Sequence, residues 1–145
     1  MKQKLYNSKF EILPRLMLLT SFDQEKTYTE DQMIAYDFMT IYSGEFLRQG
    51  RNLHGDNGFK YSEFAARKQA VSGAIKELVR KGMLQVKLQD GFKYSATDAG
   101  VDRFKHMESS YASEYTEQLQ LIMNQYSEYS ESDLQKLIRS KSMKE

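Results

Sequence analysis

Residues 62–97 read SEFAARKQAVSGAIKELVRKGMLQVKLQDGFKYSAT, and this stretch decides the fold class. Ser62 is placed to cap a short helix, because a serine side chain satisfies free backbone amides at a helix start. A stronger helix is predicted from about residue 67 to Lys81 by apolar residues at helical spacing. These residues are Val71, Ile75 and Leu78. Gly82 is expected to end this helix.

The residues after this glycine predict a β-hairpin. Apolar and polar side chains alternate in 84–88 and again in 92–96, which is the period of a β-strand. Between them Asp90-Gly91 is a strong turn signal, and Thr97 is placed to cap a further helix. Helix, helix, glycine, strand, turn and strand is the order of a winged helix-turn-helix.

Two capping boxes on the N-terminal side predict two further helices. Ser8 opens one helix that runs to about Phe22, and Thr29 opens a second that runs to about Tyr42. Residues 44–60 follow and hold four of the eight glycines. This stretch predicts a long irregular loop, and loops of such length are uncommon unless they are functional.

From Ser110 the sequence predicts one long helix with an aromatic and aliphatic stripe. The stripe consists of Tyr111, Tyr115, Leu119, Ile122 and Tyr126. Ser130 is placed to cap a last short helix. The fold class is therefore expected to be mainly α with a small β-hairpin. We assign residues 1–107 to a winged-helix domain with its wing-bearing core at 62–97, and residues 108–145 to a C-terminal helical extension that packs on the domain or on a partner.

The composition argues against a membrane protein. The most apolar stretch is 12–19, which Pro14 and Arg15 interrupt, whereas a membrane span needs about 20 apolar residues. No signal-like apolar run follows the basic residues at the start. The chain has no cysteine, which fits a reducing compartment. We therefore expect a cytoplasmic protein without a membrane segment.

No arrangement of residues predicts a catalytic or metal site. Gly50 and Gly55 have the spacing of a phosphate-binding loop, but Asp56 and Asn57 stand where that loop needs Lys and Ser or Thr. No nucleophile elbow or catalytic triad is recognisable. The chain has two histidines and no cysteine, whereas zinc takes about four nitrogen or sulfur ligands. We expect a protein that is not an enzyme and that needs no cofactor or metal.

The distribution of charge leaves DNA binding open. Residues 60–105 carry a net charge of +5 between acidic flanks, although the whole chain carries only +1. The predicted recognition face of the 67–81 helix consists of Gln69, Gly73, Lys76 and Arg80, which point outward, and Ser72 on its shoulder. In a DNA-binding winged helix this face enters the major groove, and Lys87 and Lys93 on the wing meet phosphates. Two cations on the face are few for a DNA-binding protein, so a solvated face or a protein contact is the alternative interpretation.

The 44–60 loop and the helix from Ser110 are the predicted partner-binding regions. Leu121 and Met123 widen the apolar sector of that helix beyond the stripe, which suggests burial against a second neighbour. The partner-contact candidates are His54, Tyr111, Tyr115, Leu121 and Met123. Arg67 is predicted to point near the buried sector, where it either hydrogen-bonds loop carbonyls or lies along the surface of the core.

Residues along most of the chain also follow the pattern of a known family. They are Tyr36-Asp37, Ser43-Gly44-Glu45, Asn52-Leu53-His54, Arg67, Arg80-Lys81-Gly82-Met83-Leu84, Asp90-Gly91-Phe92-Lys93-Tyr94, Thr97, Gly100 and Tyr111-Ala112. Over roughly residues 8–127 the chain resembles the small middle component of the ABC three-component systems, predicted bacterial conflict modules. Glu45, where an aspartate is more familiar, and a longer loop at 55–58 depart from the pattern. The resemblance implies a non-enzymatic adaptor, encoded beside an ABC-type ATPase and an effector, that links the two.

The sequence thus supports a protein-binding winged-helix adaptor, with an ABC-type ATPase and an effector as candidate partners. The alternative is a DNA-binding transcriptional regulator that uses the same helix and wing on duplex DNA. A third class is a small-molecule sensor with a pocket under the 44–60 loop. A homo-oligomer is compatible with each of these functions.

Overall fold

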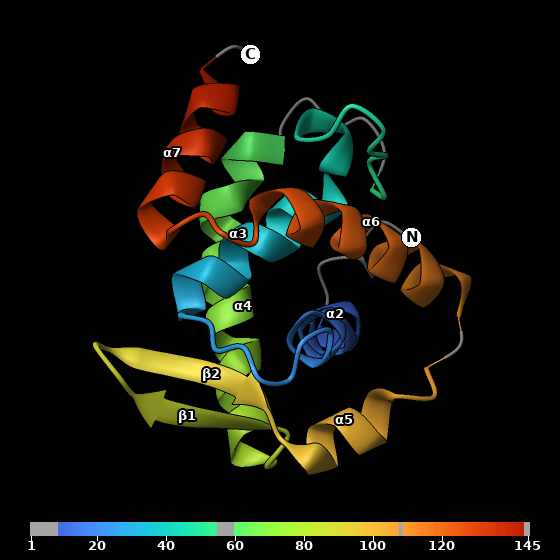
Figure 1. Ribbon diagram of the computed structural model, residues 1–145, viewed down its shortest axis with the longest axis vertical. Coiled ribbons are helices and arrows are strands. Elements are labelled where there is room, and N and C mark those ends of the chain that lie inside the picture. The colour runs from blue at the N-terminus through green and yellow to red at the C-terminus, as the bar shows by residue number, and fades with distance from the viewer. Residues whose placement is uncertain (1–8, 55–59, 108, 144–145) are drawn as a thin grey trace.

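The computed structural model describes residues 9–54, 60–107 and 109–143. They form a mainly helical protein with one small antiparallel hairpin, as the sequence predicted (Figure 1). The elements in chain order are α2 (Lys9–Ser21), α3 (Glu30–Ile41), the short 3₁₀ helix η1 (Ser43–Glu45), α4 (Lys60–Arg80), β1 (Leu84–Leu88), β2 (Phe92–Ala96), α5 (Asp98–Phe104), α6 (Ser110–Tyr126) and α7 (Glu131–Ser142). Among the described helices, none combines the length and the apolar content that a bilayer span requires.

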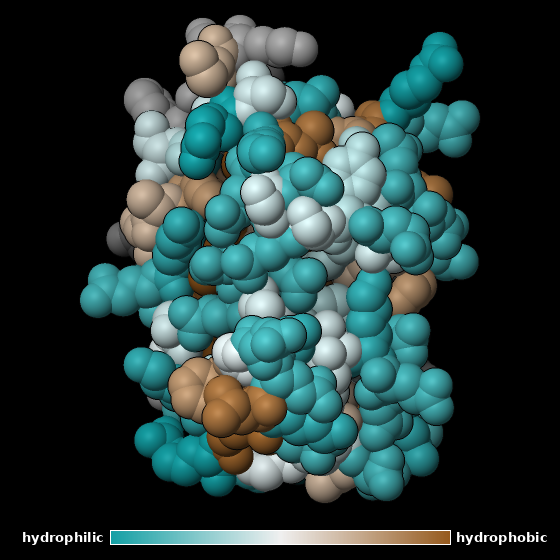
Figure 2. All heavy atoms as spheres, turned by 60° about the vertical axis from the view of Figure 1, so that its left-hand side comes forward, coloured by the Kyte–Doolittle hydropathy of each residue, from teal (hydrophilic) through white to brown (hydrophobic). Residues whose placement is uncertain are grey.

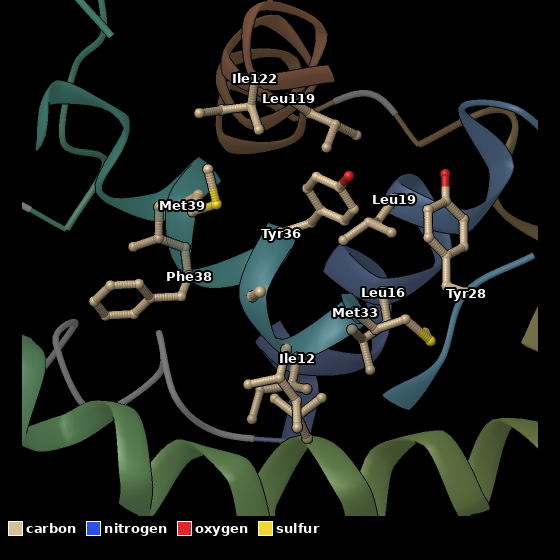
Figure 3. Close-up of a cluster of buried hydrophobic side chains, with 14 of the residues drawn as sticks. Ile12, Leu16, Leu19, Tyr28, Met33, Tyr36, Phe38, Met39, Leu119 and Ile122 are labelled. Carbon is tan, nitrogen blue, oxygen red and sulfur yellow. The ribbon is translucent and has the colours of Figure 1, made fainter. Parts of the chain in front are cut away.

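α3 is the central element of the fold. Every residue from Met33 to Ile41 is buried, and the helix contacts α2, α4, α6 and α7. Figure 3 shows the Tyr36 side chain directed towards Leu119 and Ile122 of the predicted α6 stripe. A helix buried on all sides must be enclosed by other elements, so the C-terminal helices complete the core around α3.

Local capping chemistry sets the starts of several helices. The Thr29 side chain accepts from the Gln32 amide at 3.1 Å, and the Gln32 side chain accepts from the Thr29 amide at 2.9 Å. The Thr97 and Ser130 side chains cap α5 and α7 by accepting from the amides of Gly100 and Asp133. These three caps are confirmed, whereas the box predicted at Ser8 lies outside the described residues.

The region before the hairpin differs from the sequence prediction. One continuous helix, α4, begins at Lys60, so Ser62 lies inside its first turn and does not cap a separate helix. Residues 63–67 contain neither Gly nor Pro, and two of them are Ala, the best helix former, so nothing interrupts the helix there. The prediction of two separate helices in this region is therefore wrong. The winged-helix assignment stays a prediction, now built on α3, α4 and the hairpin.

Gly82 ends α4 as predicted. Its φ of +76° lies in the left-handed region that favours glycine. The Met83 amide donates to the Leu78 carbonyl at 2.9 Å, and the Gly82 amide donates to the Val79 carbonyl at 3.0 Å. These two bonds form a Schellman motif, which satisfies carbonyls at the helix end and redirects the chain into β1.

The hairpin also forms as predicted. β1 and β2 pair antiparallel over their whole length, with Leu88 opposite Phe92 next to the turn. Asp90 and Gly91 both adopt positive φ, at 54° and 97°. Aspartate and glycine are the residues that hairpin turns of this kind demand, which explains why the prediction was reliable here.

Candidate functional site

A buried ion pair joins α2 to α3 in the middle of the core. Arg15 Nε lies 3.0 Å from Asp37 Oδ1, and Arg15 Nη2 lies 3.1 Å from Asp37 Oδ2. Both side chains are fully buried. Two parallel charge-assisted hydrogen bonds give strength and a fixed geometry, so this pair sets the relative position of the two helices.

Two further helices reach the same carboxylate. Tyr115 of α6 donates its hydroxyl to Asp37 Oδ1 at 2.8 Å, and Arg67 of α4 places Nη1 3.6 Å from Asp37 Oδ2. The Arg67 guanidinium also lies over the Phe38 ring, 5.9 Å from its centroid. Among the described residues, none accepts a hydrogen bond from the guanidinium of Arg67. We call Arg15, Asp37, Arg67 and Tyr115 the ionic centre.

The electrostatics of the ionic centre keep its groups in fixed protonation states. Burial raises the pKa of Asp37, but the charge and hydrogen bonds of Arg15, together with Arg67, bring it below its usual value. Burial lowers the pKa of Arg67; Asp37 raises it, Arg15 lowers it, and the net direction is down. Burial and Asp37 raise the pKa of Tyr115 well above its usual value. Asp37 is thus an anchor with both oxygens occupied, not an accessible general base.

Only Arg67 of this centre was predicted from the sequence as a polar residue near the core. Arg67 is 5% exposed, and its partner is Asp37 instead of the loop carbonyls. Asp37 and Arg15 were missed. The signal was present, because Asp37 follows Met33 by four positions and Ile34 by three and so lies on the inward face of its helix. A charged residue at such a position requires a partner.

Residues 43–54, which cover most of the predicted irregular loop, are held by polar contacts. Ser43 Oγ donates to Gln118 Oε1 of α6 at 2.6 Å and accepts from the Arg51 amide at 2.9 Å. The segment begins with η1, and α4 takes over from residue 60 onwards. Residues 43–54 are therefore better ordered than the glycine content of the predicted loop suggested, and 55–59 lie outside the described residues.

The structure brings two partner-contact candidates together. Nε2 of His54 lies 2.9 Å from the Tyr111 hydroxyl oxygen, and the rings stack with centroids 6.1 Å apart. Burial lowers the pKa of His54 to about 3, and the charges of Arg15 and Arg67 act in the same direction. His54 is therefore neutral at pH 7, and it ties the loop to α6. The described part of the chain holds no cluster of His, Asp and Glu suited to a metal ion.

The other three candidates separate into core and surface. Tyr115 belongs to the ionic centre and Met123 is buried in the hydrophobic core, so neither side chain faces a partner. Leu121 is half-buried and lines an open depression of about 910 Å³ between residues 46–49 and the second half of α6. This depression lies beside the loop under which a small-molecule pocket was hypothesised.

Four of the five residues predicted for the recognition face are exposed on α4. They are Gln69, Gly73, Lys76 and Arg80, and they border a groove of about 490 Å³ beside the start of α2. The fifth, Ser72, is half-buried and donates to Glu30 of α3 at 3.1 Å. Arg80 pairs with Glu77 at 3.6 Å, which offsets part of the positive charge of this face.

The hairpin carries lysines on one face and large apolar side chains on the other. Lys87, which is exposed, and Lys93, which is half-buried, lie opposite each other across the two strands. On the other face Leu88 is 75% exposed, its cross-strand neighbour Phe92 is 63% exposed and Val86 is 42% exposed. Figure 2 shows a hydrophobic patch at the height of the hairpin. We call Val86, Leu88 and Phe92 the apolar hairpin face.

The body of the protein covers only the base of this surface. Leu84 lies on the same face of β1 and is 2% exposed, and Ala96 opposite it is 1% exposed. Exposure then rises towards the turn. This surface was not predicted from the sequence, because strand alternation shows which side chains share a face but not how far along the strand that face is covered.

A model of the ABC-three component system Middle Component 2 family matches residues 5–145. The chain belongs to this family. The resemblance predicted from the sequence is thereby confirmed, over a longer stretch than predicted. No curated protein and no solved structure matches the chain.

In this Middle Component 2 chain, many residues that carried the resemblance lie inside the fold. Asp37 and Arg67 belong to the ionic centre, and Ser43 and His54 hold the loop against α6. Others are exposed, among them Arg80, Asp90 and Phe92, and of these three only Phe92 is a large apolar side chain. The inward residues account for the architecture, so a surface that meets other molecules has to be sought among exposed groups such as those of the hairpin.

Proposed function

We propose that this chain is a non-enzymatic adaptor that binds another protein of its ABC three-component system through the apolar hairpin face. The observation that carries the proposal is the exposure of Leu88 and Phe92, two adjacent large apolar side chains that are 75% and 63% exposed. Contiguous exposed apolar surface is typical of a protein-binding site, because association removes it from water. Membership of a system described as having three components supports a protein partner.

The energetics of the apolar hairpin face suit a protein interface. Fully burying an exposed Leu or Phe side chain contributes about 1.5–3 kcal/mol. Two such neighbours can therefore form the centre of an interface, where a few large side chains carry most of the binding energy. A phosphate backbone offers no matching apolar surface, since its contacts are made by cations and hydrogen-bond donors.

DNA binding through α4 and the hairpin lysines is the competing function. The observation in its favour is that Lys76 and Arg80 are both exposed beside one groove. Against it, Arg80 shares its charge with Glu77 at 3.6 Å. The two functions differ in salt dependence, because phosphate binding weakens steeply as salt rises whereas an apolar interface does not.

The test is co-expression of the full chain with the ABC-type ATPase and the effector of the same system, followed by co-purification and calorimetry. Leu88→Glu combined with Phe92→Glu should weaken binding about a hundredfold or more, because each hot-spot side chain contributes about 2 kcal/mol. Gln85→Lys places a charge on the opposite face of β1 and is the matched control, which should not weaken binding.

A complex that survives the Leu88 and Phe92 changes removes the hairpin from the interface and overturns the proposal. For the competing function, Lys76→Ala with Arg80→Ala should lower the salt slope of duplex DNA binding by about two. An unaltered slope removes both residues from phosphate contact.

A further inference from the structure

The outer edge of β1 is open in the described part of the chain. On β2, Tyr28 covers the outer edge at Tyr94, and the two residues exchange backbone hydrogen bonds of 2.9 and 2.7 Å. β1 pairs with β2 and with no other described segment. An open strand edge presents N–H and C=O groups with which a further strand can pair.

The backbone groups at this edge belong to Val86 and Leu88. Tyr94 directs both its N–H and its C=O to Tyr28, so its partner in the register, Val86, directs its own groups away from β2. Because the pattern alternates along an antiparallel strand, Leu88 does the same, whereas Lys87 bonds to β2. Towards the turn, the open edge therefore presents the outward-facing donors and acceptors of Val86 and Leu88.

We propose that the partner binds by adding an extended strand to the outer edge of β1. The inference rests on the proposed function and specifies its geometry. Val86 and Leu88 supply exposed side chains to the apolar hairpin face and outward backbone groups to the edge. One extended segment can therefore meet both, with main-chain bonds giving affinity and side-chain contacts giving selectivity.

The charges of the hairpin define the chemistry of the added strand. β1 and β2 contain Lys87 and Lys93 and no acidic residue. The two lysines lie directly opposite each other, and like charges in this position are destabilising. A carboxylate of an added strand beside Lys87 relieves that repulsion. The partner segment therefore alternates apolar residues, on the side of Leu88, with Asp or Glu on the side of Lys87.

Val86→Pro separates the backbone contribution from that of the side chain. Proline removes the N–H that faces the open edge and leaves the bonds to β2 intact, which is why proline is tolerated on edge strands. Affinity for the co-expressed partner should fall about tenfold or more, because a main-chain bond is lost and the ring crowds the added strand. Val86→Thr keeps the N–H and a similar shape, and it should stay within about threefold.

Hydrogen exchange provides a second measurement that needs no variant. In the free chain the amides of Val86 and Leu88 should exchange faster than that of Lys87, and in the purified complex both should become protected. The inference fails if these amides stay unprotected in the complex. It also fails if Val86→Pro binds normally while Leu88→Glu with Phe92→Glu abolishes binding, and the adaptor proposal then stands.

Two further outcomes are decisive. If the complex tolerates every hairpin variant, both the adaptor proposal and strand addition are overturned. If the amides of Val86 and Leu88 become protected as the concentration of the chain alone rises, and light scattering shows a dimer, the edge pairs with a second copy. That result also overturns the proposed partner.

Discussion

Arg15 and Asp37 are fully buried in the ionic centre, whereas Leu88 and Phe92 of the hairpin lie mostly in solvent. Charged residues are rarely buried and large apolar residues commonly are, so the two regions depart from the usual distribution in opposite directions. In the ionic centre each arginine has the Asp37 carboxylate within 3.6 Å. The tip of the hairpin has no comparable cover among the described residues. The fold therefore compensates the buried charges of the ionic centre, whereas the exposed apolar side chains of the hairpin are the observation on which the proposed protein contact rests.

The largest effect is expected from removing the carboxylate of the ionic centre. Asp37→Ala leaves Arg15 and Arg67 without an opposite charge in the core, and breaking a buried pair in this way costs about 3–5 kcal/mol. Urea denaturation should show this loss in the free energy of unfolding. Asp102→Ala is the control, because its pair with Lys105 lies in solvent, where water and salt screen the two charges, so its loss should change the stability little. Equal losses in the two variants would mean that the buried charges are not coupled.

The two arginines of the centre should contribute unequally. Arg15→Met removes two hydrogen bonds to Asp37 and should cost about 3 kcal/mol, because the carboxylate then loses its best partner. Arg67→Met removes a cation that lies 3.6 Å from Asp37 and has no hydrogen-bond acceptor among the described residues, so it should cost about 1 kcal/mol or less. The comparison uses the same denaturation assay. A larger loss for Arg67→Met would show that this arginine is the main counter-charge.

As the pH falls, the shifted pKa of His54 should lower the stability of the chain at a higher pH than the shifted pKa of Asp37 does. The folded pKa of His54, about 3, is below its usual value of 6.5, so the unfolded state binds the extra proton and stability falls as pH drops below 6.5. Asp37 acts in the same direction, but only below its usual pKa of 3.8. Between pH 6.5 and 5 the loss should reach about 1–2 kcal/mol. His54→Phe keeps an aromatic ring beside Tyr111 and should flatten this part of the profile; an unchanged profile assigns the loss to other groups.

Elements specified by neighbouring residues were predictable from the sequence. The turn at Asp90-Gly91, the helix end at Gly82 and the capping box at Thr29 each depend on a few consecutive residues, and all three formed. The α6 stripe was predictable because helical spacing fixes which side chains share a face. The error at Ser62 has the same origin, because a serine suits a cap and also tolerates a helix interior when no Gly or Pro follows.

Features that depend on distant residues were not predictable in the same way. Arg15 and Asp37 are 22 positions apart, and Asp37 and Tyr115 are 78 apart, so the ionic centre exists only once four helices have packed. Periodicity placed Leu121 and Met123 together on a widened sector, yet packing buried Met123 and left Leu121 half-exposed. The extent of cover along β1 likewise depends on where the body of the protein ends, which no local pattern encodes.

The smallest effect on stability is expected at the apolar hairpin face. This prediction tests most directly the comparison between the ionic centre, which the fold covers, and the hairpin tip, which it leaves exposed. Leu84 and Leu88 belong to the same strand and the same face, but Leu84 is 2% exposed and Leu88 is 75% exposed. Leu84→Ser should therefore cost about 2–4 kcal/mol, because it removes a packed side chain and buries a hydroxyl. Leu88→Ser should change the free energy of unfolding by less than about 0.5 kcal/mol, as surface substitutions usually do. Both values come from urea denaturation of the free chain.

A loss at Leu88 as large as that at Leu84 would mean that the chain itself covers the hairpin tip, and the surface would then belong to the core. If Leu88→Ser leaves the stability of the free chain unchanged but weakens the complex, then the Leu88 side chain contributes to binding and not to folding.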